Sequence, residues 1–454
     1  MKLTAKLLQK RLIIPLVAMV VFLVTAIALL IFKKDTGGKT FFMMASFAAS
    51  YYAYHNLKTQ WKQISKGILI GLGTILFLFL IIETIKAATS KDEWDFMCFY
   101  MQGQLGLHHL PFYNAHSFKT LLQSNNYNYS FSDGFKNEIL NVGLLPPPIS
   151  MLFFAPLGSM DYHTARIILA IFIFIFIFAN TFLANLIFTK RERSAYSFLF
   201  IFIIIMLLPG TNGTIGYNQT NFFLLFFLLL TIYTINKPLS GFYLALSLIL
   251  KPISGFLVLF FISDKKWKAV IYFLATVILL FSITAFFWGF QNIFGFLQSP
   301  PTQRLPLDLY EQDVNQSILA VFNRNLREYG LSRNMINLIY YFAVAVLTGL
   351  SYLVSKRFNK INIYFSFCTF ILCMLMIYPS SLDHYMVYLS PLLIYFLFLK
   401  EGKKYFWLII LPAISFLRTE AFFSYLILWI ALLFIGFFLI KTDLKEKLAL
   451  DTNR

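Results

Sequence analysis

The sequence predicts an all-α integral membrane protein, a bundle of about 12–14 transmembrane helices with re-entrant segments. Of its 454 residues, 59% are hydrophobic and only 13% are charged. Apolar runs of roughly 15–25 residues recur along the chain, close to the 20 or so helical residues that cross a bilayer. These runs are continuous rather than alternating, which favours helices over a transmembrane barrel.

The apolar runs define the expected elements in chain order. They are 12–32, 40–56, 67–86, 144–158, 164–188, 194–209, 219–235, 239–262, 268–290, 334–355, 361–378, 384–399, 404–417 and 420–440. The first run has a basic start but no small-residue cleavage site, so we interpret it as a retained helix rather than a signal peptide. No soluble domain interrupts the runs, and we expect one membrane domain over 1–454.

Two long polar stretches, 87–143 and 291–333, interrupt the apolar pattern. The net charge is +18, and its Lys and Arg residues gather in short loops, which indicates topology signals rather than nucleic-acid binding. With the N-terminus inside, three crossings place 87–143 outside an inner cell membrane, and 291–333 follows on the same side. The first of these extracytoplasmic loops is expected to contain short amphipathic helices, with 95–107 lying on the membrane surface.

This count places the basic run 190–193 outside, against the positive-inside rule. Two re-entrant segments would move it inside. Segment 144–158 begins with three consecutive prolines, which cannot start an ordinary helix interior. Segment 239–262 is expected to break at Lys251-Pro252 and to return to the side from which it came. Because non-helical backbone at membrane depth must be buried in protein or line a wet cavity, this topology implies a cavity.

Asp95 is the candidate general base. It is one of three acids within four positions, with Asp92 and Glu93, on the first large loop. One interpretation is a helix N-terminal acid, because carboxylates favour the positive end of a helix dipole. The other is a base that takes a proton from an acceptor hydroxyl. Asp95 lies deepest in the aromatic-rich part of the loop, which favours the second.

Lys251 lies inside an apolar run, far from the basic loops on either side. It could snorkel to the membrane interface. Ionisable residues inside membrane segments are nevertheless costly and are functional candidates by default. The functional interpretation is a cation that binds a lipid-linked phosphate.

Further polar candidates lie on the predicted outer side. Arginine forks match phosphate oxygens, so Arg304 and Arg324 are candidates, although each alone is more often a solvated loop charge. His384 follows Asp383 at the start of an apolar run. This pair is either a helix-start acid with an interfacial histidine or a histidine that donates to a phosphate or sugar.

No nucleotide-binding motif is present, so an activated donor would reach the site from the membrane or the outer compartment. The three cysteines, Cys98, Cys368 and Cys373, form neither a disulfide framework nor a zinc pattern.

Several short motifs follow one another along residues 67–400. They are Asp95 with Phe96, "GLHHLPFY" (106–113), "LLPPPISMLFFAPLGSM" (144–160), "NQTN" (218–221), "LILKP" (248–252), "NQS" (315–317) and "DHY" (383–385). In this order they resemble the polyprenyl-phosphate-mannose-dependent mannosyltransferases of glycosyltransferase family 87, in the GT-C class. The chain departs from that pattern at Asn218, where the family has glycine, and at Leu145, where it has tyrosine.

The resemblance implies a GT-C-like fold and an inverting transfer of a hexose, namely mannose, from polyprenyl phosphate to a lipid or glycan hydroxyl outside the membrane. It implies Asp95 as the base, with these other residues: Lys251, Arg304, Arg324 and His384 on the donor phosphate, and Tyr113, Gln219, Asn221, Asn315, Gln316 and Asp383 on the substrates. We expect no cofactor and no metal, because a monophosphate reduces the need for a bridging cation. The expected partners are donor, acceptor and membrane lipids, without nucleic acid.

Two alternatives stay open at this point. An O-antigen-type polymerase or ligase also combines many helices with a large outer loop, but a carboxylate on the first loop favours the transferase. A lipid-linked sugar flippase would use Lys251 and the broken helix as its substrate site. Under the transferase interpretation, we expect Asp95, Lys251, Arg324 and His384 to surround one cavity.

Overall fold

The described chain is helical throughout its regular structure. The computed structural model describes residues 36–56, 59–90, 95–123, 146–189, 194–298, 315–359, 362–398, 403–414, 422–423 and 425–436. In these residues, the extended pairing is limited to one isolated bridge between Asn315 and Leu382. The predicted all-α class is confirmed.

Four helices in the described ranges are long and apolar enough to cross a membrane, or five spans if a bent pair is counted as one. They are α3 (Thr59–Thr89), α8 (Tyr162–Phe188), α14 (Trp267–Trp288) and α19 (Arg333–Phe358). Their most apolar stretches are only 22–44% buried, so most of their apolar surface is available to lipid. The protein is therefore a multi-pass membrane protein.

The other expected segments form shorter or broken helices. They are α2 (Thr36–Asn56), α4 (Asp95–Leu107), α5 (Ala115–Gln123), η1 (Pro148–Ser150), α7 (Met151–Gly158), α9 (Ala195–Leu207), α10 (Pro209–Gly216), α11 (Asn221–Tyr233), α12 (Leu239–Ser247), η2 (Pro252–Leu257), α13 (Val258–Ser263), α15 (Phe290–Gln298), α18 (Ile318–Leu326), α20 (Ile363–Ile377), η3 (Asp383–Leu389), α21 (Ser390–Phe398), η4 (Lys403–Ile410), α22 (Leu411–Ile414) and the apolar helix Tyr425–Gly436. The predicted run 12–32 lies outside the described residues.

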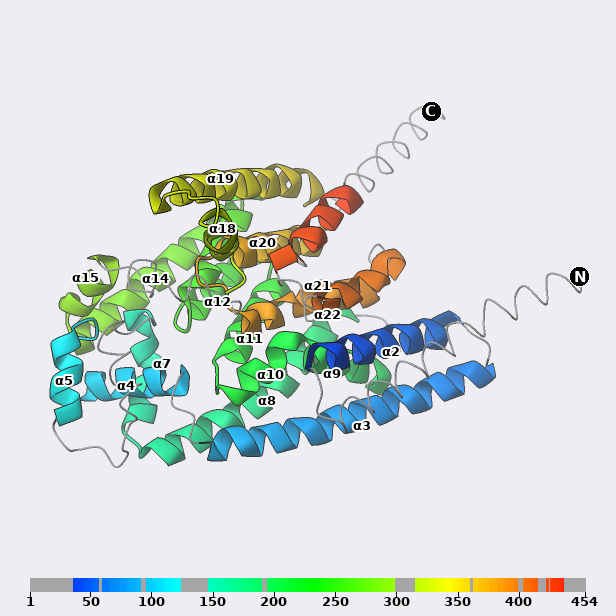
Figure 1. Ribbon diagram of the computed structural model, residues 1–454, viewed down its shortest axis with the longest axis horizontal. Coiled ribbons are helices and arrows are strands. Elements are labelled where there is room, and N and C mark those ends of the chain that lie inside the picture. The colour runs from blue at the N-terminus through cyan, green and yellow to red at the C-terminus, as the bar shows by residue number, and fades with distance from the viewer. Residues whose placement is uncertain are drawn as a thin grey trace, which may run out of the picture.

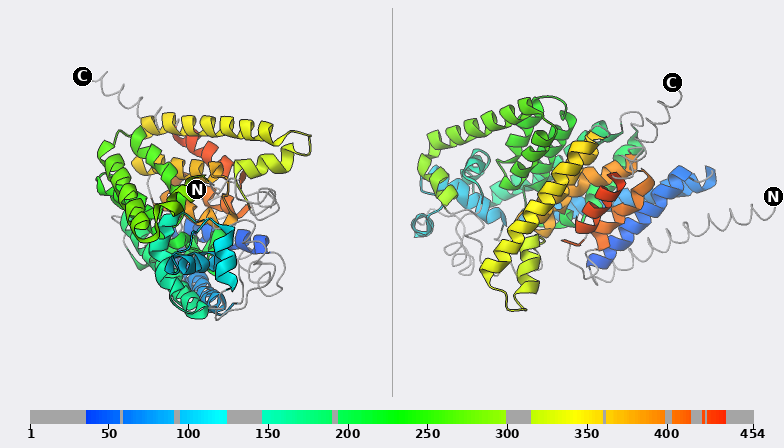
Figure 2. Two further views of the ribbon diagram at one scale, coloured as in Figure 1. Left: turned by 90° about the vertical axis from the view of Figure 1, so that its left-hand side faces the viewer. Right: turned by 90° about the horizontal axis from the view of Figure 1, so that it is seen from above.

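Figure 1 shows how these helices are arranged. Helix α3 runs along one side of the bundle, with α2 and α8 packed against it. Helix α19 lies on the opposite side and packs on α20, and the two views of Figure 2 show it crossing the bundle as one long rod. Helices α4, α5, α7 and α15 gather at one end of the molecule.

Helix α4 has the predicted boundaries, but it does not lie on a surface. Residues on several of its sides are buried, and α7 crosses it at close range. The crossing is possible because Gly103 and Gly158 face each other: a Cβ on Gly103 would collide with the backbone oxygen of Phe154. Small residues at a helix crossing let two backbones approach in this way. The expectation of an interfacial helix over 95–107 is therefore wrong.

The segment that contains the three prolines begins and ends at α4. The amide of Gln102 donates to the carbonyl of Pro147 at 3.2 Å, before the short helix α7. The hydroxyl of Tyr100 donates to the carbonyl of Met160 at 2.8 Å, after it. Both ends therefore lie at the same end of the bundle, as the re-entrant interpretation of 144–158 requires.

The segment 239–262 also returns to where it started. Lys266, which follows α13, donates through Nζ to the carbonyl of Ile235 at 2.7 Å and to Asn236 Oδ1 at 3.1 Å, just before α12. Between the two arms the backbone of Lys251 is extended (φ −151°, ψ 134°) and Pro252 starts η2. The predicted break at Lys251-Pro252 is thus confirmed.

The expected segment 194–209 is bent, and the loop after it is partly helical. Helices α9 and α10 meet at an angle of 72°. Leu208 between them is extended (φ −62°, ψ 127°), because the ring of Pro209 disfavours the helical conformation of the residue before it. The residues Pro209–Gly216 therefore form a helix of their own where the sequence suggested loop.

The described parts of the two polar stretches touch each other. The backbone N–H of Phe112 donates to Asn292 Oδ1 at 2.8 Å, and the rings of Tyr113 and Phe296 lie 5.7 Å apart. The two stretches therefore share one end of the molecule, as the topology count expects. The side of the membrane on which this end lies stays a prediction.

Candidate active site

A cavity of about 100 Å³ with an acid and a lysine in its wall lies where α4, the proline segment, the Lys251 break and η3 meet. It is lined by Asp95, Cys98, Phe99, Pro146, Pro147, Gln219, Leu250, Lys251, Pro252, Tyr378, Ser380, Leu382 and Tyr385. These residues come from segments far apart in the sequence. A cavity of this size can accommodate a reacting centre rather than a whole lipid.

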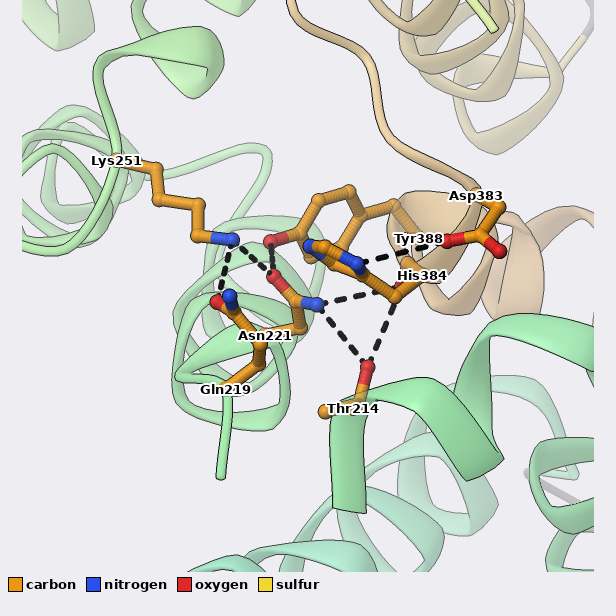
Figure 3. Close-up of polar contacts among 7 residues, drawn as sticks. All are labelled: Thr214, Gln219, Asn221, Lys251, Asp383, His384 and Tyr388. Carbon is orange, nitrogen blue, oxygen red and sulfur yellow. Dashed lines mark hydrogen bonds and ion pairs between the residues drawn. The ribbon is translucent and has the colours of Figure 1, made fainter. Parts of the chain in front are cut away.

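Lys251 reaches the cavity from the tip of the broken segment. Its side chain is only 7% exposed. Nζ donates to Gln219 Oε1 at 2.9 Å and to Asn221 Oδ1 at 2.8 Å, and it lies 4.1 Å from the ring centroid of Tyr385 (Figure 3). The ammonium is thus held by two amide oxygens and an aromatic face.

These contacts orient the ammonium without neutralising it. Amide oxygens and a phenol ring are uncharged, whereas burying an ammonium is costly unless a negative charge compensates it. Asp95 supplies attraction, since it lines the same cavity and interacts electrostatically with Lys251. The cavity therefore combines one acid and one cation, with space for a polar group between them.

Asn221 fixes the orientation of this arrangement. Its Oδ1 also accepts a hydrogen bond from the Tyr388 hydroxyl at 2.7 Å. Its Nδ2 donates to Thr214 Oγ1 at 3.0 Å and to the carbonyl of His384 at 3.2 Å (Figure 3). Because both ends of the amide are occupied, its oxygen must face Lys251. Asn221 is therefore a positioning residue for the ammonium.

His384 lies behind the cavity wall, next to Tyr385. Its side chain is 5% exposed, and Nδ1 lies 3.5 Å from Asp383 Oδ1. In Figure 3 its other nitrogen points toward the Lys251 ammonium. This Nε2 is buried and has no hydrogen-bond partner among the described residues.

Three further predicted site residues do not line the cavity themselves. Arg324 donates to the carbonyl of Asn315 at 2.9 Å, and Asn315 Nδ2 donates to the carbonyl of Pro379 at 3.0 Å. Gln316 Oε1 accepts from the backbone N–H of Phe422 at 3.1 Å. The structure thus brings Asp95 and Lys251 to the cavity, but not Arg324.

Tyr113 and Arg304 remain to be placed. The Tyr113 hydroxyl donates to the carbonyl of Pro146 at 2.7 Å, so it supports the proline wall from outside. Arg304 lies outside the described residues.

Sequence reasoning missed several residues that hold the site. Tyr385 belongs to the "DHY" motif and could have been found there, whereas Thr214 and Tyr388 carry no local signal. Cys98 lines the cavity one turn after Asp95, and helical spacing could have predicted that the two share a face.

Arg166 was missed as well. It is 1% exposed, donates through Nε to the carbonyl of Ala87 at 2.7 Å and through a terminal nitrogen to the Tyr162 hydroxyl at 2.9 Å. The Tyr162 ring lies 5.3 Å from that of Phe96. Arg166 therefore ties the end of α3 to the start of α4, the residue after Asp95 included.

Comparison with known proteins gives one family. A family model described as glycosyltransferase family 87 matches residues 145–379, more than half of the chain. This region includes Gln219 and Lys251 but ends before His384 and begins after Asp95. No curated protein and no solved structure matches. The chain therefore belongs to glycosyltransferase family 87 and is a membrane glycosyltransferase.

Proposed function

We propose that the protein transfers a hexose, namely mannose, from a polyprenyl phosphate to a hydroxyl of a lipid or glycan acceptor, with inversion, on the outer face of the cell membrane. One observation carries the proposal: Asp95 and Lys251 line the same cavity. An acid that accepts a proton and a cation that stabilises a departing phosphate are the two charges that such a transfer needs.

In the proposed step, Asp95 accepts the proton of the acceptor hydroxyl. The oxygen attacks the anomeric carbon from the face opposite to the phosphate. The bond between that carbon and the phosphate oxygen breaks, and its electron pair leaves with the polyprenyl phosphate. Lys251 stabilises the charge that develops on the phosphate, and its effect is strong because the site is largely shielded from water.

The membrane-embedded setting supports a lipid-linked donor. Lys251 is a point charge suited to phosphate, and it is held by Gln219 and Asn221 at the tip of a re-entrant segment. His384, with Asp383 at its other nitrogen, would donate to the phosphate or sugar from behind Tyr385. The family membership also favours the transferase over the two alternatives considered from the sequence, because the matching family is one of glycosyltransferases.

The remaining candidates receive supporting roles. Tyr113 holds the proline wall. Asn315 donates to the carbonyl of Pro379 and the backbone N–H of Gln316 donates to that of Ser381, so both hold the segment 378–382, which lines the cavity. Arg324 holds Asn315 in turn. We propose that substitutions at these positions disturb the cavity through its walls rather than through lost ligand contacts.

The Asp95→Asn variant tests the proposal. Purified protein would be assayed with radiolabelled polyprenyl-phosphate mannose and a membrane lipid extract. We expect transfer by the wild-type protein and a loss of roughly a hundredfold or more in Asp95→Asn, the range of a lost general base. Asp161→Asn is the matched control, because Asp161 caps α8 and asparagine caps helices equally well. An active Asp95→Asn variant would refute the base assignment.

A further inference from the structure

The carbonyl of Ala87 accepts hydrogen bonds from two buried side chains of other parts of the chain. Ala87 lies two residues before the end of α3, where helix carbonyls have no partner in a following turn. Arg166 Nε of α8 donates to this oxygen at 2.7 Å, and Asn218 Nδ2 donates to it at 3.2 Å. A carbonyl oxygen has two lone pairs, so these two donors satisfy it. The three residues form what we call the Ala87 junction.

Asn218 stands at a backbone position that the end of α10 requires. Its φ is +50°, in the left-handed region. Its N–H donates to the carbonyl of Ile215 at 3.1 Å, and the N–H of Gln219 donates to that of Thr214 at 2.9 Å. This pair of bonds is a Schellman motif, in which glycine or asparagine takes the left-handed position. Glycine, which the family pattern has here, would serve the motif but could not donate to Ala87, so the side-chain bond is a feature of this chain.

One arm of the Ala87 junction leads to the cation of the cavity. Asn218 is followed directly by Gln219, whose Oε1 accepts from Lys251 Nζ at 2.9 Å. The Asn218 side chain is 0% exposed, and its bond to α3 anchors the backbone beside Gln219. The end of α3 therefore fixes one of the two amides that hold the ammonium.

The other arm leads to the acid. Arg166 donates through a terminal nitrogen to the Tyr162 hydroxyl at 2.9 Å. The Tyr162 ring lies 5.3 Å from the ring of Phe96 and 5.3 Å from that of Tyr100, both in α4. Phe96 directly follows Asp95 and is 2% exposed. The start of α4 is therefore held against the same end of α3 as the first arm.

We propose that Asn218 and Arg166 are positioning residues for the transfer. By sharing one carbonyl acceptor, they set the separation between Asp95 and Lys251. This inference rests on the proposed function, in which both charged groups act on one reacting centre. Neither positioning residue is among those that line the cavity, so each acts through its neighbours. Their effect is on rate, because a misplacement of about 1 Å between reacting groups can slow a reaction roughly a hundredfold.

Asn218→Gly removes the anchor and keeps the backbone. Glycine adopts the left-handed conformation readily, so α10 should end as before and the variant should fold. With radiolabelled polyprenyl-phosphate mannose and a membrane lipid extract, we expect kcat to fall about fivefold or more. The KM for this donor should change less than about twofold, because Lys251 keeps both amide acceptors. A fall in stability with kcat unchanged would show a merely structural role and overturn the inference.

Tyr51→Phe is the matched control. The Tyr51 hydroxyl donates to the carbonyl of Leu397, one residue before the end of α21, so it too anchors a helix end through a buried bond. Tyr51 is 4% exposed and belongs to α2, which does not contribute to the lining of the cavity. This variant should leave kcat and KM unchanged, even where its melting temperature falls. An equal loss of kcat in the control would contradict a specific role for the Ala87 junction.

Arg166→Lys tests whether the two arms share one junction. Lysine keeps the positive charge but lacks the planar fork that bonds the Ala87 carbonyl and Tyr162 together. On its own it should also lower kcat. Because bonds in one network are coupled, the double variant with Asn218→Gly should lose less than the product of the two single losses. Losses that multiply would mean that the two residues act independently, and would overturn the shared junction.

A second measurement needs no turnover and is independent of the proposed function. Cys98 lines the cavity and is partly exposed, whereas Cys368 and Cys373 are buried. Asn218→Gly should raise the rate of Cys98 alkylation by iodoacetamide about threefold or more, because the cavity walls open more often, and Tyr51→Phe should not. An unchanged rate in Asn218→Gly would overturn the inference. Faster alkylation in a protein that transfers no mannose would refute the proposed function and still support the junction.

Discussion

The chemistry of the site depends on a single amide. The Oδ1 of Asn221 accepts hydrogen bonds from Lys251 and Tyr388. Its Nδ2 donates to Thr214 and to the carbonyl of His384. The lysine is thereby aimed into the cavity while its charge stays available. An anionic ligand would complete the arrangement, because the protein supplies neutral acceptors where a buried cation would otherwise be paired with a carboxylate.

Lys251→Met tests this assignment at the scale of one residue. We expect the KM for the lipid-phosphate donor to rise roughly a hundredfold, since the phosphate loses its buried charge partner. Thermal stability should fall by about 1–3 kcal/mol, because the buried oxygen of Gln219 loses its hydrogen-bond donor. Steady-state kinetics and a melting curve in detergent measure the two effects. An unchanged KM would remove Lys251 from the donor site.

Lys251→Arg is the informative companion. A planar guanidinium cannot present a single point charge to Gln219 and Asn221 in the same geometry. Charge alone should therefore not restore donor binding. Full recovery would mean that only the net charge of the site matters.

At the scale of elements, Asp95 is positioned by the close crossing of α4 and α7, and Lys251 is positioned by the helix break before Pro252. Lys251 stands where a membrane segment breaks before a proline, and Asp95 opens a buried helix that is fixed by α7 and by Arg166. The breaks could be predicted, because a proline lacks the N–H donor and disfavours the helical conformation of its predecessor. The burial of α4 could not, because the covering helix follows tens of residues later.

Gly103→Ala tests the crossing of α4 and α7. The added methyl group would meet the backbone of Phe154 and Gly158, which cannot rotate away. We expect a loss of stability of about 1–3 kcal/mol, typical of overpacking. Activity should fall as well, because α4 carries Asp95. Melting temperature and transfer rate measure the effect, with Gly71→Ala, which meets open space, as the control. A stable, fully active variant would contradict the close crossing.

At the scale of the whole molecule, the two returning segments determine the topology. The contacts of Gln102 and Tyr100 with the ends of one segment, and of Lys266 with the start of the other, show that each segment leaves on the side from which it entered. With both segments returning, the crossing count predicts that residues 190–193 lie inside the cell and that the cavity lies near the outer surface. Under this prediction the basic stretches 57–66, 190–193, 264–268, 356–360 and 400–404 all lie inside, as the positive-inside rule expects.

Cysteine labelling in spheroplasts tests that topology. Cys98 lines the cavity, whereas Cys368 and Cys373 are 1% and 0% exposed. A membrane-impermeant maleimide should therefore label Cys98 from outside and leave the other two unmodified. In a Cys98→Ser background, Arg191→Cys should react only after permeabilisation. Labelling of that residue in sealed spheroplasts would rule out the two returning segments.

The sequence by itself determined the helical membrane class, the breaks at the prolines and the two charged candidates. These follow from local rules. Lipid forces backbone groups to pair within helices, and an ionised side chain in an apolar run is costly and therefore marks a functional candidate. The tertiary structure alone decided which polar residues meet. Lys251 and Asp95 share a cavity while Arg324 holds the Asn315 carbonyl, and α4 is buried rather than interfacial. Such encounters depend on how distant helices pack, and helix packing leaves no periodic mark on the sequence near either partner.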